Sequence, residues 1–305
     1  MLDSYDIGLH KGHSPEAAVP LIEKIRTENR LGGAGNVGLN LKNLDLNPII
    51  VSVVGDDVAG KKLKNLCDEN GMQSELIVEA DRPTTIKKRI VDKNFHQFLR
   101  IDTESRADIT MVTETQISTV VAQLISESNI AGLVIQDYNK GVCTEFVIKA
   151  IQDIGRQSDI PIFVDPKHKN FSLLASYCTI FKPNIKELSS IAHRDIAADA
   201  ASINAALEAH GLDSPELVFV TLGAEGVFFR KKENPPQIDI VKGLEIKDAD
   251  VSGAGDTVLA VLIWGYLKKF NIHQLTNLAN KAGASVCGKP GVSSILLSDV
   301  DGDKT

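Results

Sequence analysis

Short apolar runs that alternate with helical patterns constrain the fold of this 305-residue chain more than any other feature. The runs at 48–54, 132–136, 161–164 and 217–221 are nearly continuous and rich in β-branched residues. Strands of this kind are buried on both faces, as in a parallel sheet that helices cover on each side. The sequence therefore predicts an α/β fold in three layers, with a mostly parallel central sheet flanked by helices.

Two segments with mixed polar and apolar strand patterns, near 17–25 and 84–101, interrupt this rhythm. They predict an inserted β-element, a small β-lid formed by about residues 8–30 and 82–102. No Pro/Ser-rich linker, low-complexity segment or internal repeat divides the chain. We therefore expect a single domain over residues 1–305 that carries this lid.

Composition narrows the class of protein. Apolar residues make up 43% and charged residues 24%, as in ordinary globular proteins. The net charge of −7 and the absence of a Lys/Arg run argue against a nucleic-acid partner. The four cysteines lack metal-ligand spacing, and the sequence has neither a signal peptide nor an apolar run of membrane-spanning length. We expect a cytoplasmic protein.

The segment Asp250–Thr257 is a turn of mostly small residues that leads directly into an apolar helical pattern at 258–267. Helix N-termini bind anions, and Gly253 and Gly255 allow the backbone to approach a ligand closely. Asp256 would repel a bound phosphate unless it accepted a proton from an attacking hydroxyl. The alternative is an ordinary N-cap among small residues, and this segment alone does not decide between the two.

A second glycine-rich turn, Leu31–Leu41, opens another helix. It matches neither the dinucleotide-binding GxGxxG pattern nor the GxxxxGK[ST] pattern of a P-loop. The glycines indicate either close packing of this helix on a neighbour or a backbone that approaches a ligand, and both interpretations stay open.

Polar residues follow four successive strands of the predicted sheet, where ligands of open α/β sheets bind. One such residue is more simply a solvated loop charge, but four strand ends in succession favour a site. Their Lys, Asp and Asn side chains suit phosphate and Mg²⁺, and the chemistry indicated is phosphoryl transfer from a nucleotide to a hydroxyl. The residues are Asp137, Lys140, Asp165, Lys167, Lys182, Asn184 and the turn Thr221–Gly223.

Four segments in the expected order resemble signatures of the ribokinase-like (PfkB-type) sugar kinases. Gly32–Asn36 resembles the N-terminal glycine signature, and Asn184–Glu187 resembles the N-x-x-E element. Thr221–Gly226 is similar to the nucleotide loop, and Asp250–Asp256 to the D-T-x-G-A-G-D signature, with Val251 where Thr is commonest. The resemblance covers essentially the whole chain and implies a ribokinase-like fold and an ATP-dependent sugar kinase.

The resemblance also implies roles on the nucleotide side. Asp256 would deprotonate the anomeric hydroxyl of the sugar, and the N–H groups of Gly253, Ala254 and Gly255 would form an anion hole. ATP phosphates and Mg²⁺, the latter reached through water from Glu187, would be bound by Lys182, Asn184, Ile185, Lys186 and Glu187. The nucleotide would contact Thr221, Gly223, Gly226 and Asn280, and a monovalent cation such as K⁺ would bind near Asp250.

Within the family, several further segments resemble the heptose-7-phosphate kinases: His13–Pro20, Pro83–Arg89, Gln97–Asp102, Asp137–Gly141 and Asp165–Lys167. This implies phosphorylation of the C1 hydroxyl of D-glycero-D-manno-heptose 7-phosphate to heptose 1,7-bisphosphate, for ADP-heptose and lipopolysaccharide precursors. The implied substrate-binding residues are Asp3, Gly33, Asn36, Lys87, Arg89, Arg100, Lys140, Asp165 and Lys167. Family analogy also implies a homodimer formed through the β-lid.

Two alternatives to this function stay open. One is a kinase of the same fold that acts on another sugar or sugar phosphate, and the other is a non-catalytic sugar- or nucleotide-binding relative. Bifunctional heptose kinases carry a fused adenylyltransferase, and no segment of this sequence resembles one. We therefore expect a stand-alone kinase or an isolated kinase domain.

The family's first strand, which ends four residues before the sugar-binding Asp that Asp3 resembles, has no counterpart in this sequence. A truncated N-terminus or a misassigned start would explain this. Without that strand we expect a neighbouring strand to lack a partner, the core to be open, and stability or activity to be impaired.

Overall fold

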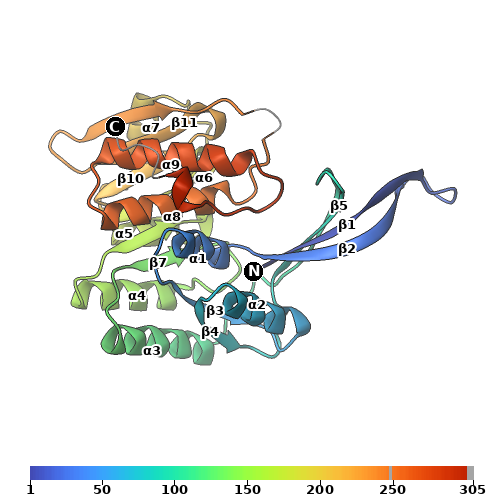
Figure 1. The fold of residues 1–305 in the computed structure, drawn as a ribbon. Helices are drawn as coiled ribbons and strands as arrows, with labels where there is room; N and C mark the ends of the chain where they lie inside the picture. The colour runs from blue at the N-terminus through green and yellow to red at the C-terminus, as the bar shows by residue number, and fades with distance from the viewer. Residues whose placement is uncertain (247–248, 301–305) are drawn as a thin grey trace.

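The computed structural model describes residues 1–246 and 249–300, in which helices cover both faces of a mostly parallel sheet (Figure 1). The strand order is β12-β11-β10-β9-β8-β7. The four strands from β7 to β10 are parallel, and β11 and β12 add an antiparallel edge. The bounds are β7 Leu133–Gln136, β8 Ile162–Asp165, β9 Ile180–Phe181, β10 Leu217–Thr221, β11 Gly226–Lys231 and β12 Gln237–Lys242.

Alternate residues of these strands enter two separate cores, because successive side chains of a strand point to opposite faces. Phe163, Ile180 and Phe219 belong to one core, whereas Val164 and Phe181 belong to the other. The first core includes α1 (Ala34–Asn43), α8 (Ala254–Leu267) and α9 (Ile272–Cys287). The second includes α4 (Glu145–Gln157), α5 (Phe171–Ser176), α6 (Ile185–Ala192) and α7 (Ala200–Ala209). The predicted three-layer arrangement is confirmed, although the short helix α5 was not predicted.

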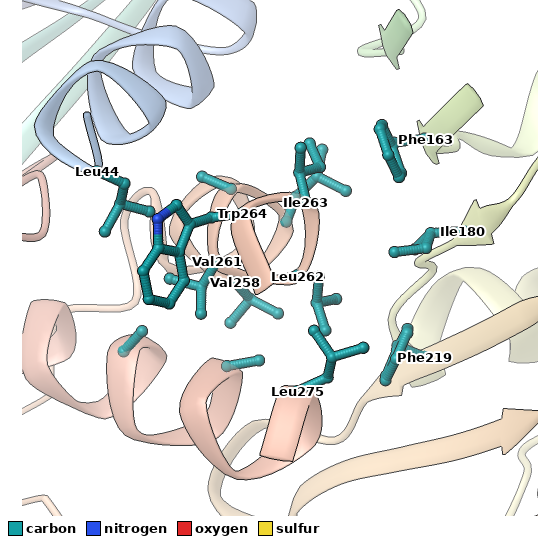
Figure 2. Packing of buried hydrophobic residues seen from close by; sticks show 14 of the residues in the cluster. Leu44, Phe163, Ile180, Phe219, Val258, Val261, Leu262, Ile263, Trp264 and Leu275 are labelled. Carbon is teal, nitrogen blue, oxygen red and sulfur yellow. The ribbon is translucent and has the colours of Figure 1, made fainter. Parts of the chain in front are cut away.

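Helix α8 is the most completely enclosed element of the first core. Ten consecutive residues from Asp256 to Gly265 are buried. Figure 2 shows its side chains fanning out in several directions, with Ile263 and Leu262 toward Phe163 and Phe219 of the sheet and Trp264 toward Leu44. A helix that is apolar all round must be surrounded by protein, and this enclosure begins at Asp256, immediately after the glycine turn.

The β-lid is a four-stranded sheet, ordered β2-β1-β5-β6, that projects from the body of the molecule (Figure 1). Its strands are β1 Leu2–His13, β2 Pro20–Leu31, β5 Ile86–Asp92 and β6 Gln97–Thr103. The predicted lid is therefore present, but its first strand begins at Leu2, ahead of the expected boundary. Residues 17–19 were predicted as strand and lie outside β2.

Strands β3 (Ile49–Val54) and β4 (Gln73–Val78) form a parallel pair that is separate from the two larger sheets. The helices that accompany this pair are α2 (Val58–Glu69) and α3 (Met111–Glu127). Strands β3 and β7 line a shared cavity. Among the described residues, each of them is hydrogen-bonded to a neighbouring strand on one side only, and its other edge faces this cavity. The cavity measures about 470 Å³ and is lined by 49–53 and 133–136. The unpaired strand and open core expected from the sequence are thus observed.

No helix in the described ranges combines the length and apolar character needed to cross a membrane.

The cavity between β3 and β7 generates a prediction about stability. A five-residue Val/Ile-rich extension joined to the amino group of Met1, which also lines the cavity, is expected to enter as a parallel strand. Burial of two of its side chains would stabilise the fold by about 3 kcal/mol or more, raising the melting temperature by at least about 4 °C. A Gly/Ser extension of equal length is the control. Equal melting temperatures for the two extended chains in differential scanning calorimetry would contradict the prediction.

Candidate active site

The glycine turn before α8 is held in a conformation that only glycine adopts readily. Gly253 caps the helix with φ of 80°, and a Cβ there would lie 2.8 Å from Nδ2 of Asn36. The following residues, Ala254 and Gly255, begin the helix. The N–H of Ala254 donates to the carbonyl of Val251 at 3.3 Å, so that group is engaged within the turn itself.

The carboxylate of Asp256 lies in the first turn of α8, and the residue is only 3% exposed. Asn36 Nδ2 donates to Oδ2 at 2.9 Å, while the Tyr138 hydroxyl and Gln136 Nε2 donate to Oδ1 at 2.8 and 3.1 Å. Burial raises the pKa of Asp256 to about 6, against the opposing effect of hydrogen bonds from Asn36 and Tyr138. A carboxylate with this pKa is ionised near neutral pH and can still act as a proton acceptor.

Two of these donors, Gln136 and Tyr138, were not among the residues predicted from the sequence. Both adjoin the strand-end residue Asp137, which the sequence did mark. Gln136 is the one polar residue of β7, and a polar side chain at the end of a buried apolar strand was a usable signal.

A buried cation lies beside the N-terminus of α8. Lys182 is 2% exposed and pairs with Asp165, with 3.1 Å between Nζ and Oδ2. A Cβ added to Gly255 would lie 3.6 Å from Lys182 Nζ, so the ammonium group faces the helix turn. The predicted anion hole is therefore adjacent to a positive side chain that could neutralise a phosphate oxygen.

The predicted N-x-x-E element forms the capping box of α6. Asn184 Oδ1 accepts from the Glu187 N–H at 2.9 Å, and Glu187 Oε2 accepts from the Asn184 N–H at 2.8 Å. The other carboxylate oxygen of Glu187 contacts Lys167. Ile185 and Lys186 occupy the first turn between them. Both signature residues therefore have a structural role in capping this helix.

The predicted nucleotide loop lies next to this helix start. Thr221 forms an isolated parallel bridge with Asn184. Gly226 has φ of 108°, and a Cβ there would approach the Val241 carbonyl to 2.0 Å, so glycine is required for the β10–β11 turn. Gly223 faces open space, and Asn280 donates to the Lys242 carbonyl at 2.6 Å. The loop thus adjoins the Asn184 element, while Asn280 joins α9 to the end of β12.

Three predicted sugar-binding residues, Asp3, Gly33 and Asn36, contact either the lid or the groups that hold Asp256. Asp3, within β1, pairs with Arg89 and packs against the backbone of Gly32. A Cβ at Gly33 would contact the Tyr138 ring at 3.3 Å. Asn36 donates directly to the Asp256 carboxylate. These residues therefore connect the part of the lid nearest the body of the molecule to Asp256.

Four cations predicted to bind the substrate phosphate converge at the base of the lid. Lys87 has a pKa lowered by burial, and Arg89, Arg100 and Lys140 are near enough to lower it further. Lys87 Nζ lies 5.1 Å from the Tyr138 ring centroid. Three of the four are paired: Arg89 with Asp3, Arg100 with Asp102 at 3.0 Å, and Lys140 with Glu104 at 2.5 Å.

Asp250 ties two loops together. Its carboxylate accepts from the N–H groups of Ser252 at 2.9 Å and Gly291 at 2.8 Å. Burial would raise its pKa, but these hydrogen bonds outweigh that effect and lower it. Across the described residues, no group of three or more His, Cys, Asp or Glu side chains could hold a metal. Any divalent ion would therefore depend on phosphate oxygens and water as well as protein ligands.

Comparisons with solved structures show the same fold. Phosphofructokinase-2 from Escherichia coli, in complex with substrates and products, has a TM-score of 0.79 at 20% identity and covers 98% of this chain and 94% of its own. Ribokinase from Giardia lamblia has a TM-score of 0.73 at 18% identity, with coverage of 98% and 95%. The predicted ribokinase-like fold is confirmed.

Curated relatives are also similar over nearly the whole chain. They include the bifunctional protein HldE of Hyphomonas neptunium, 33% identical over 98% of this chain, and that of Pelobacter propionicus, 35% identical over 98%. The chain spans 61% and 60% of the length of these two relatives. The pfkB family carbohydrate kinase pattern matches residues 7–299. The chain belongs to the pfkB family of carbohydrate kinases.

Proposed function

We propose that this kinase transfers the γ-phosphoryl group of ATP to the C1 hydroxyl of D-glycero-D-manno-heptose 7-phosphate. The product, heptose 1,7-bisphosphate, would supply ADP-heptose and lipopolysaccharide precursors, in the cytoplasm where ATP is available. The observation that carries the proposal is the buried Asp256 carboxylate at the N-terminus of α8, beside the Lys182 ammonium group. The heptose assignment rests on the sequence resemblance described above.

The geometry supports a direct transfer. Asp256 takes the proton of the acceptor hydroxyl as its oxygen bonds to the γ-phosphorus, and the bond from that phosphorus to the ADP oxygen breaks. The N–H groups of the α8 turn, at Gly253 to Gly255, and the Lys182 ammonium stabilise the charge on the transferring group. The Ala254 N–H would first have to leave the Val251 carbonyl.

Metal ions complete the proposal. Glu187 is proposed to hold Mg²⁺ through water, as the family resemblance implies; its carboxylate lies at the start of α6, where it contacts Lys167. When bound, Mg²⁺ neutralises charge on the phosphates. K⁺ near Asp250 is also proposed, at a carboxylate whose pKa is kept low by the hydrogen bonds that it accepts from the Ser252 and Gly291 N–H groups.

The charge at the lid base supports a phosphorylated substrate. Arg89, Arg100 and Lys140 are each near enough to Lys87 to lower its pKa, and Arg89 and Arg100 are directly opposite in the β5–β6 register. Arginine binds phosphate in a bidentate manner, whereas lysine acts as a point charge. A sugar whose reacting end reaches Asp256 would extend its phosphate toward this cluster.

The lid also supports a homodimer. Several of its large apolar side chains are well exposed: Leu9, Leu21, Ile25, Leu99 and Ile101. Exposed apolar side chains concentrated on one projecting sheet are typical of a protein interface.

Asp256→Asn is expected to lower kcat by about 10²- to 10⁴-fold, because the amide cannot accept the proton. The affinity for ATP should change little, since the side chain faces the acceptor. Isothermal titration with a non-hydrolysable ATP analogue and a coupled ADP assay measure the two effects. Turnover near the wild-type rate would contradict the base assignment.

A panel of acceptors with ATP and Mg²⁺ tests the substrate. Heptose 7-phosphate should give a higher kcat/KM than fructose 6-phosphate or ribose, and Arg100→Ala should raise its KM about tenfold, with the KM for ATP unchanged. Arg156→Ala, which removes an exposed pair with Asp153 away from the lid, is the control. Preference for fructose 6-phosphate or ribose would favour another sugar kinase, and no turnover at all would favour a non-catalytic relative.

Ile101→Glu tests the lid interface. A charge on an apolar contact surface is expected to shift a dimer to monomer at micromolar concentration, as measured by light scattering after size exclusion. Val58→Glu, at an exposed apolar residue of α2, should leave the mass unchanged. A wild-type chain that is monomeric at all concentrations would refute this assignment.

A further inference from the structure

The hydrogen bonds on Asp256 are distributed unequally between its two oxygens. Oδ1 accepts from both Tyr138 and Gln136, whereas in the described part of the chain the hydrogen bond to Oδ2 comes from Asn36. A carboxylate oxygen has about two lone-pair positions for hydrogen bonds. Oδ1 is therefore filled, and one position on Oδ2 remains for a further donor.

We infer that Gln136 and Tyr138 are positioning residues that fill Oδ1 of Asp256 and thereby direct the acceptor hydroxyl to Oδ2. This inference rests on the proposed role of Asp256 as the base. In the step itself, the O–H bond of the acceptor breaks and its proton passes to Oδ2. The acceptor oxygen forms the new bond to the γ-phosphorus, and ADP leaves with the electrons of the broken P–O bond.

Gln136 is suited to this role because its amide lies between two carboxylates. Nε2 donates to Asp165 Oδ2 at 3.0 Å and to Asp256 Oδ1 at 3.1 Å. Two carboxylates so close would repel each other without donors between them. The reversed amide would place its oxygen against both, so the orientation is determined by charge. Its own oxygen, Oε1, is buried without a hydrogen-bond partner in the described chain, a cost that both N–H bonds offset.

Tyr138 is held from both the lid and the core. Its ring centroid lies 5.1 Å from Lys87 Nζ of β5 and 5.6 Å from Lys167 Nζ, which follows β8. Enclosure of the hydroxyl, with the charge of Asp256 beside it, raises the pKa of Tyr138 well above its usual value. The hydroxyl therefore stays protonated and remains a donor to Oδ1 throughout the working pH range.

Other charged groups also face Asp256 and affect its ionisation. The negative charge of Asp165 opposes ionisation of Asp256, and the positive charge of Lys182 favours it. In turn, the charge of Asp256 acts on Lys167 and on the amino group of Met1. Substitutions at 136 and 138 leave all of these groups in place. A change in the pH dependence of the reaction would therefore report the loss of the Oδ1 donors.

The test measures kcat against pH for Tyr138→Phe and Gln136→Met, with ATP, Mg²⁺ and whichever sugar the acceptor panel identifies. Removing a donor from an ionised carboxylate raises its pKa, so the acidic limb should move to higher pH. If the acidic limb of the wild type lies near pH 6, a rise of about one unit in that pKa lowers kcat roughly threefold at pH 6.5. At pH 8.5 the same rise hardly changes kcat. Both KM values should stay within about twofold. Tyr177→Phe, outside the site, is the matched control.

Each alternative has its own outcome. A loss of kcat that is equal at all pH values, in variants with normal circular dichroism and melting temperature, would overturn the inference in favour of a structural role. A large rise in the KM for the sugar would overturn it in favour of a substrate contact. If Asp256→Asn is inactive but the acidic limbs of Tyr138→Phe and Gln136→Met stay at the wild-type pH, the positioning role is refuted while the base assignment stands. If Asp256→Asn remains active, the base assignment and this inference fail together.

Discussion

The site depends on the burial of helix α8 from Asp256 to Gly265. Because the helix is apolar on all sides, it lies between the sheet, α1 and α9, and the core residues of α8 begin at Val258, two positions after Asp256. That packing holds the Gly253 turn against Asn36 and encloses the Asp256 carboxylate. The desolvation that raises the pKa of this carboxylate is therefore a direct consequence of how the core is built.

Opposite charges are paired throughout the site. Lys182 pairs with Asp165, Lys167 with Glu187, and Arg89 with Asp3. A buried pair gains little net stability, but removing one partner leaves an uncompensated charge. A carboxylate therefore compensates each of these three cations. Anionic substrates would compete with the carboxylates for the same cations, which links phosphate binding to the local positions of Asp3 and Glu187.

The lid and the body meet where the acceptor would bind. Tyr138 extends from the end of β7 and contacts Lys87 of the lid, while its hydroxyl reaches Asp256 of α8. Three elements far apart in the chain therefore converge on one carboxylate. In the proposed reaction, movement of the lid would act on Asp256 through this ring and would connect substrate contacts of the lid to the orientation of the proton acceptor.

The sequence by itself determined the α/β class, the lid, the glycine turn and Asp256, because strand periodicity, turn glycines and helix starts are local properties of the chain. It also indicated that a neighbouring strand would lack a partner, and the structure identifies the strands concerned as β3 and β7. Only the tertiary structure decided which donors hold Asp256, because Gln136 and Tyr138 are about 120 residues away and their side-chain directions follow from packing. It likewise showed that Asn184 and Glu187 form a helix cap and that Asp3 is paired with Arg89. Such pairings depend on distances between elements, which no local pattern encodes.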